Sequence, residues 1–266
     1  MEKSLEVTVN ISDYLLTPLS CSSFVNTFFK GLLYQKTQIP YPYAWLKCSI
    51  TRRRNREEPL ELRGPDRFRI ENQYRVASKL YDGLEDVLNE LANELRTNTV
   101  NEILILFGST PLTPKEICRI KIPNLALGHF EQVHVKEAIK LQHNALRQIF
   151  LSDLWMDSID SSIPCTNIYF YITKHSDDES SKFKACNPLN FQNNVKQYTI
   201  KLNPDLSKDY SCCRVYDENN EILENEDTTA NSTEQEEKPL SWYQFDNRLE
   251  GYSNLYIEGI GVSDLW

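Results

Sequence analysis

The sequence predicts an α+β fold in which three long helices pack on one face of a mostly antiparallel sheet. Three stretches within the first 156 residues repeat apolar side chains at helical spacing. The later residues contain short stretches typical of strands. A chain of 266 residues without internal repeats can bury one large core. We therefore expect a single domain over 1–266, with 1–156 as its core.

The first predicted elements are a strand and a helix. Leu5–Ile11 alternates apolar and polar residues, as a half-buried strand does. Serines within 20–23 can cap a helix over about 23–36, and the prolines of Ile39–Pro42 end it. The apolar residues of this helix recur at helical spacing and are Phe24, Val25, Phe28, Phe29, Leu32 and Leu33.

A basic run and a second helix follow. Lys47–Gly64 contains the run Arg-Arg-Arg-Asn-Arg and then Pro59. Because no aromatic residues interleave with the arginines, we favour a solvated loop, with a nucleic-acid or nuclear-import patch as the alternative. The next helix is predicted over 70–96. Its apolar face consists of Ala77, Leu80, Leu84, Val87, Leu88, Leu91 and Leu95.

The middle of the chain predicts a strand, a turn and the third helix. Glu102–Phe107 is a short apolar run typical of a buried strand, and Gly108–Pro114 is rich in turn residues. Pro114–Glu116 can open a short turn of helix. Glu131–Met156 lacks Gly and Pro and is rich in good helix formers, so it predicts one long helix.

The third helix carries more apolar surface than one core contact needs. A first stripe contains Ala138, Leu141, Ala145, Ile149 and Met156, and a second contains Val135, Ile139, Leu146 and Phe150. Together they span about 220° of the helix, whereas packing on one side of a core uses little over 100°. The helix is therefore either covered on two sides by its own domain or offers one stripe to another protein.

After residue 156 the pattern changes to strands joined by polar segments. Disorder is predicted for the loop 217–238, because its acidic composition offers too little apolar surface to bury. The predicted strands are Thr166–Thr173, Gln197–Leu202, Tyr210–Tyr216, Leu240–Phe245 and Asn254–Ile260.

Composition argues against several classes of function. The segment Tyr216–Lys238 supplies −8 of the net charge of −9, so the rest of the chain is close to neutral. We therefore expect neither nucleic acid nor a membrane as a partner. No apolar run is long enough for a membrane span, and the first residues do not resemble a secretory signal. Seven scattered cysteines without a CxxC motif indicate reduced thiols of the cytoplasm or nucleus.

Motifs for catalysis or for metal binding are sparse. Gly108-Ser109-Thr110 follows a strand but lacks the spacing of a phosphate-binding loop. His134 and His143 would lie about 180° apart on a helix, so one metal could not take both. Cys212 and Cys213 would point to opposite faces of a strand. We expect no enzyme, no cofactor and no metal, with a small hydrolase that uses one Ser or Cys as a remaining alternative.

Three segments resemble a known family. They read FVNTFFKGLLYQKTQIPYPYAWLK at Phe24–Lys47, VNEILILFGSTPLTPKEICRIKI at Val100–Ile122, and RQIFLSDLW at Arg147–Trp155. In this order they resemble the comet family, whose members bind the Mad-two HORMA protein of the spindle checkpoint. The resemblance thins beyond Met156.

The resemblance implies a HORMA-like fold. Three helices would lie on a sheet, and 157–266 would form the C-terminal safety-belt region. In comet-like members the last strand, here Asn254–Ile260, fills the place where other HORMA proteins trap a partner's peptide. The domain would then be permanently closed.

The resemblance also implies a non-enzymatic adaptor. Such a protein docks on the closed conformer of Mad-two through its third helix and presents it to a Pch-two-type AAA-plus ATPase. The outcome would be disassembly of the mitotic checkpoint complex and checkpoint silencing, in nucleus and cytoplasm and at the kinetochore and spindle in mitosis. The alternative is another HORMA-type peptide-binding adaptor of the meiotic axis or of DNA repair. Truncating Leu255–Trp266 would distinguish the two, because it would open or unfold the domain only if the chain's own last strand fills the safety belt.

The resemblance assigns candidate site residues. Gln35 matches an interface glutamine of the family, although a glutamine at a helix end is also commonly just exposed. The side of the third helix with Ile139, Leu146 and Phe150 would meet the partner helix, and Leu146 stands where the family has an aromatic residue. For the ATPase the family uses a Pro-Lys pair; the nearest match is Pro188, with Lys184 upstream.

Overall fold

The computed structural model describes most of the core of the chain. The described residues are 4–55, 65–159, 163–175, 180, 182–191, 195–204, 213, 240–253, 256–257 and 260–261. Two predicted segments fall on other residues: the acidic loop 217–238 lies outside the described residues, and so does Tyr210–Tyr216 apart from Cys213.

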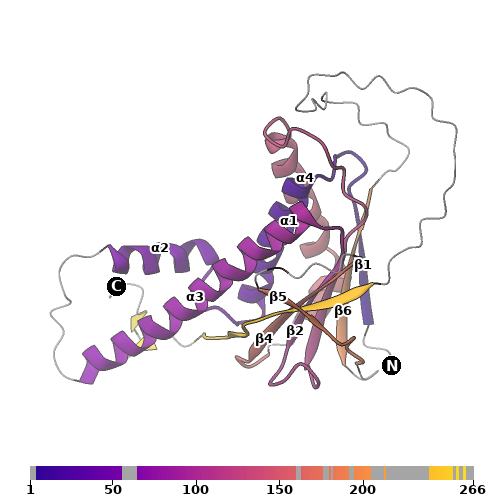
Figure 1. The fold of residues 1–266 in the computed structure, drawn as a ribbon. Coiled ribbons are helices and arrows are strands. Elements are labelled where there is room, and N and C mark those ends of the chain that lie inside the picture. The colour runs from indigo at the N-terminus through magenta and orange to yellow at the C-terminus, as the bar shows by residue number, and fades with distance from the viewer. Residues whose placement is uncertain are drawn as a thin grey trace, which may run out of the picture.

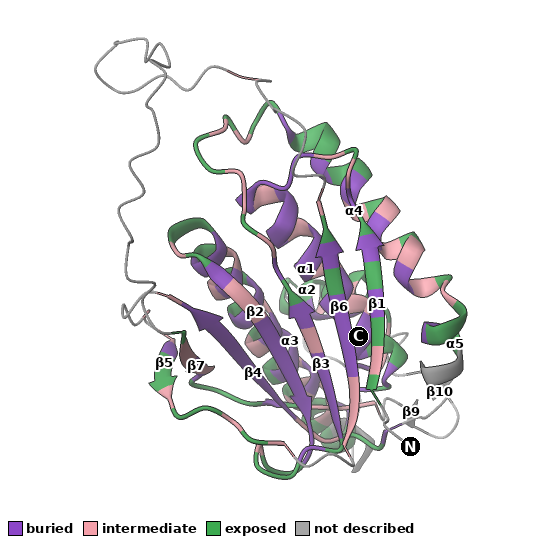
Figure 2. Cartoon of the chain, turned by 90° about the vertical axis from the view of Figure 1, so that its right-hand side faces the viewer, coloured by how far each residue is buried: buried purple, intermediate pink, exposed green. Residues whose placement is uncertain are grey.

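An eight-stranded mixed sheet forms the centre of the fold (Figure 2). Its order is β1-β6-β3-β2-β4-β7-β5, with β8 paired to β4. The β6 strand runs parallel to both β1 and β3, and every other pairing in this sheet is antiparallel. The strands are β1 Ser4–Asn10, β2 Val100–Phe107, β3 Glu116–Lys121, β4 Asn167–Lys174, β5 Phe183–Cys186, β6 Lys196–Asn203, β7 Ser241–Phe245 and β8 Leu249–Glu250.

The helices cover one face of this sheet (Figure 1). They are α1 Pro18–Gln35, α2 Tyr43–Arg54, α3 Pro65–Thr97, α4 Val135–Phe150 and α5 Asp153–Ile159. A smaller apolar cluster on the sheet includes Leu104, Leu106 and Tyr171, against which Leu189 and Phe191 pack. The predicted α+β class is confirmed, and the helical layer contains α2 and α5 besides the three long helices.

The central helix α1 is held in the main core by a continuous apolar face. Phe24, Phe28 and Leu32, one helical turn apart, are completely buried. The helix begins at Pro18, earlier than the predicted position near residue 23. The reason is a capping box, in which the Thr17 side chain accepts from the backbone N–H of Ser20 and the Ser20 hydroxyl accepts from the backbone N–H of Thr17.

The predicted loop at Lys47–Gly64 is wrong in its first part, because α2 extends through Arg54. Leu46 and Ile50, four residues apart, are buried in the core, and this contact favours a helix. Arg52, Arg53 and Arg54 of the basic run lie in the last turn, where cations interact favourably with the helix dipole. Arg54 also forms an ion pair with Asp82 of α3, at 2.7 Å between Nη2 and Oδ2.

The predicted helical turn at Pro114–Glu116 is also wrong. Glu116 begins β3, whose residues pair with β2 on one side and β6 on the other. Ile117, Cys118 and Ile120 are buried in these ladders, so tertiary pairing determines the local structure.

The predicted single helix at Glu131–Met156 is divided. Its first regular part, α4, ends at Phe150, and α5 begins at Asp153. The break is stabilised by Ser152, whose hydroxyl accepts a hydrogen bond from the backbone N–H of Trp155 at 3.2 Å. The side chain of Trp155 is then buried at the end of the core.

The C-terminal segment differs from the predicted single strand at Asn254–Ile260. In its described residues, β9 (Tyr256–Ile257) pairs antiparallel with β10 (Ile260–Gly261), apart from the eight-stranded sheet.

A candidate protein-binding surface on α4

The inner stripe of α4 faces the core. Four of the five residues of the first predicted stripe are buried: Ala138, Leu141, Ala145 and Ile149. Met156, the fifth predicted member, lies in α5 and is 54% exposed. Its assignment to this stripe is wrong, because the break after Phe150 changes the direction in which it points.

The outer stripe of α4 is incompletely covered by its own domain (Figure 2). Val135 is 43% exposed and Ile139 is 47% exposed. Leu146 and Phe150 are half-buried and pack against the margin of the core. The spacing of four and seven residues from Val135 through Ile139 to Leu146 places these side chains along one face of the helix. Neither predicted possibility holds for the whole stripe, because Val135 and Ile139 are open to solvent whereas Leu146 and Phe150 contact the core.

Phe150 belongs both to this stripe and to the core. Its ring stacks on Phe28 of α1, with centroids 6.2 Å apart, and packs in a T-shaped arrangement with Trp155, with centroids 5.8 Å apart. Gly31 makes room for it, since a Cβ at Gly31 would lie 3.1 Å from the Cζ atom of Phe150. One face of the Phe150 ring therefore belongs to the core of the domain.

Gln35 lies at the same end of the stripe. It is the last residue of α1 and is exposed. Because it follows Gly31 by four residues, it lies one turn further along the face of α1 that Phe150 contacts. The next residue, Lys36, is buried and forms an ion pair with Glu116 at 2.8 Å between Nζ and Oε2. This pair anchors the end of the helix that carries Gln35.

Polar contacts fix α4 against α1 and β1. The hydroxyl of Ser23 donates to the Gln142 side-chain oxygen at 2.6 Å. The Gln148 side chain forms hydrogen bonds with the backbone of Asn10, accepting at 2.9 Å and donating at 2.8 Å. These contacts join α4 to α1 and to β1, and a surface that is already ordered loses less entropy when it binds a partner.

Exposed apolar residues continue into the loop before α4. Leu127, Phe130 and Val133 are exposed, and Val133 is only two residues before the helix. Sequence reasoning missed them, because they show no periodicity and only the structure shows that this apolar loop is uncovered.

The two residues predicted for an ATPase contact lie at the far edge of the sheet. Lys184 is exposed on β5, and Pro188 is exposed just beyond that strand. The β5 strand ends one side of the sheet order, whereas β1, which α4 contacts, ends the other (Figure 2). The structure thus brings Gln35, Leu146 and Phe150 to one region and separates them from Lys184 and Pro188.

The structure also gathers a set of side chains that could bind a metal. His129, His134 and Cys213 offer one ligand atom each, all within 4.8 Å of one another. Hydrogen bonds to Cys213 and Glu137 raise the pKa of His134 above its usual value. The predicted incompatibility of His134 with His143 is consistent with the structure, where His143 is exposed on α4 and His134 is buried.

Fold and surface together define an α+β domain with a partly uncovered apolar face on α4. Among the described residues, no helix combines the length and the apolar character needed to cross a membrane. The comparison with protein families gives a match to p31comet, described as "Mad1 and Cdc20-bound-Mad2 binding", over residues 15–209. The chain therefore belongs to the p31comet family.

Curated relatives agree with this assignment. The human MAD2L1-binding protein is 28% identical over 137 residues, covering 52% of this chain and 49% of the relative. The mouse MAD2L1-binding protein is 28% identical over 134 residues, covering 50% and 47% respectively. The chain thus matches about half the length of these relatives.

Proposed function

We propose that this chain is a non-enzymatic checkpoint adaptor that binds the closed conformer of Mad2, the Mad-two protein, through the outer face of α4. The observation that carries the proposal is the exposure of Ile139 and Val135 on a helix whose inner face is already buried in the core. Membership in a family described by Mad2 binding supplies the partner.

The contact would be a pairing of helices. Ile139 and Leu146 lie seven residues apart, so they form a ridge that an apolar groove on a partner helix can accept. Gln35 would add a hydrogen bond at the end of this ridge, beside Phe150. The exposed Phe130 and Val133 would extend the apolar contact beyond the start of α4.

Presentation to a Pch-two-type AAA-plus ATPase is the second part of the proposal. Lys184 and Pro188 are exposed at the sheet edge opposite α4, so a Mad2 molecule on α4 would leave them accessible. A protein with two such surfaces could hold a substrate and its remodelling enzyme together. Mitotic checkpoint complex disassembly and checkpoint silencing would follow.

The same proposal includes a HORMA-like domain over 1–266, with 157–266 as its safety-belt region. It is supported by a helical layer on one face of a mixed sheet and by the family match. We place the protein in nucleus and cytoplasm, and at the kinetochore and spindle in mitosis.

The binding surface is tested with Ile139→Asp and purified closed Mad2. Burying an unpaired carboxylate costs several kcal/mol, so the Kd should rise by about a hundredfold or more. Leu112→Asp is the matched control, because Leu112 is an exposed apolar residue of the β2–β3 turn. Equal affinities of Ile139→Asp and wild type would contradict the proposal.

A further inference from the structure

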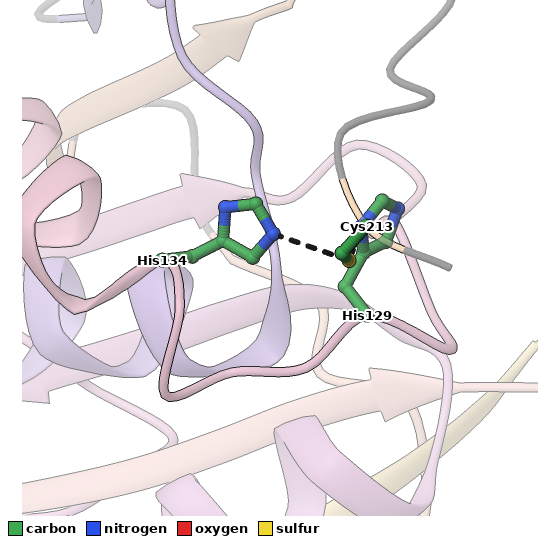
Figure 3. Close-up of side chains that lie close together, drawn as sticks. All are labelled: His129, His134 and Cys213. Atoms are coloured by element: carbon green, nitrogen blue, oxygen red, sulfur yellow. Dashed lines mark hydrogen bonds between the residues drawn. The ribbon is translucent and has the colours of Figure 1, made fainter. Parts of the chain in front are cut away.

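Two distant parts of the chain meet beside the start of α4 (Figure 3). His129 lies in the loop before the helix, His134 is the residue directly before its first turn, and Cys213 follows β6 by ten residues. The Cys213 sulfur lies 3.1 Å from Nδ1 of His129 and 3.5 Å from Nε2 of His134. His134 is buried and the other two side chains are half-buried.

These distances fit a tetrahedral metal centre. With zinc bonds of about 2.3 Å to sulfur and about 2.0 Å to nitrogen, ligand atoms at a tetrahedral angle lie about 3.5 Å apart. Both sulfur-to-nitrogen distances are close to this value. All three ligand atoms lie within 4.8 Å of one another, so shifts of an ångström or so would complete the geometry.

An orienting carboxylate is also present. Nδ1 of His134, the ring nitrogen that does not face Cys213, lies 3.0 Å from Oε2 of Glu137. Histidines that bind metals commonly donate their second ring N–H to a carboxylate, which fixes the tautomer and directs the other nitrogen toward the ion. Glu137 belongs to the first turn of α4, so the helix itself supplies this partner.

We propose that His129, His134 and Cys213 form a zinc site that joins the segment after β6 to the start of α4. Two imidazole nitrogens and one thiolate match a borderline-soft divalent transition metal, whereas calcium and magnesium require oxygen ligands. With these three protein ligands, a water molecule would complete the tetrahedron. The ion would crosslink segments that are 79 residues apart, counted from His134 to Cys213.

The site has a local consequence for the chain. His129 and His134 enclose the apolar loop that contains Phe130 and Val133. Fixing both ends of this loop to one ion would hold these exposed side chains in place. The proposal stands on the side-chain geometry alone and does not depend on which protein binds α4.

The test measures zinc bound per protein after purification, chelator treatment and reloading. Wild type should bind one equivalent, and the ion should raise its melting temperature, since a ligand of the folded state stabilises that state. Cys213→Ser and His134→Ala should each lose stoichiometric binding. Glu137→Gln should weaken affinity by about tenfold to a hundredfold. Cys186→Ser and His143→Ala are matched controls and should bind as wild type does.

Cobalt substitution gives an independent measurement. Cobalt-loaded wild type should show a thiolate-to-metal charge-transfer band and the visible bands of tetrahedral coordination, and Cys213→Ser should lose the former. Circular dichroism of each metal-free variant establishes that it folds. The proposal is overturned if folded wild type binds less than about a tenth of an equivalent, or if Cys213→Ser binds zinc as tightly as wild type. Binding that is lost only in the control variants would overturn it as well.

Discussion

Phe150 of α4 stacks on Phe28 of α1, with ring centroids 6.2 Å apart and ring planes 15° from parallel. Phe28 is completely buried, whereas Phe150 is half-buried. The outer stripe of α4 is therefore not uniform: its C-terminal end packs against the core, and its N-terminal part, at Val135 and Ile139, is exposed. Stability and binding should separate along the helix.

Phe150→Ala is expected to lower the free energy of unfolding by about 2–4 kcal/mol, because it removes stacking on Phe28 and leaves a cavity beside Gly31. Ile139→Ala should change this free energy by no more than about 0.5 kcal/mol, since its side chain is exposed. Urea denaturation measures both. Equal effects of the two changes would show that the core does not depend on Phe150.

Leu146→Asp combined with Gln35→Ala should abolish co-purification with closed Mad2 while the fold is retained. The carboxylate would be buried without a partner in the complex, and the interface amide would be lost. Circular dichroism and a pull-down measure the two properties. Leu146→Met, which keeps the apolar character, serves as the control and should bind. A folded double variant that still captures Mad2 would refute this interface.

Lys174→Met should lower the free energy of unfolding by about 3–5 kcal/mol, because it leaves the Glu94 carboxylate buried without its cation. Lys174 Nζ lies 2.9 Å from Glu94 Oε2, and both side chains are essentially inaccessible. This pair joins β4 to α3. Adding Glu94→Leu should recover much of the loss. A single variant as stable as wild type, measured in urea, would argue against the pair.

Lys184→Glu combined with Pro188→Ala should reduce capture of the AAA-plus ATPase and leave the affinity for Mad2 unchanged. Both residues are exposed at the β5 edge of the sheet. The opposite edge is β1, the strand that α4 contacts. Affinity capture from mitotic extract, with both proteins quantified, measures the two effects. Loss of Mad2 together with the ATPase would mean that the two surfaces are not separate.

Periodicity predicted the elements whose structure is set by burial. The apolar face of α3 and the inner stripe of α4 are buried as expected, because a helix with one apolar side can cover a sheet in only one orientation. The strands β2 and β4 also lie where strands were predicted, at Glu102–Phe107 and Thr166–Thr173. Local pattern and tertiary packing favour the same structure in these segments.

The sequence did not predict features that depend on distant contacts. The polar character of Arg52–Arg54 concealed α2, which is held by Leu46, Ile50 and acidic residues of α3. The division of the third helix depends on Ser152 and on the burial of Trp155. The approach of Cys213 to His134 spans 79 residues, and no local spacing encodes it.

Amide hydrogen exchange of this protein, free and bound to closed Mad2, tests the central claim most directly. If the outer face of α4 is the interface, binding should slow exchange in residues 127–150 and in the last turn of α1, and leave α2 and β5 unchanged. Slowed exchange in α2 or β5, with 127–150 unaffected, would contradict the account.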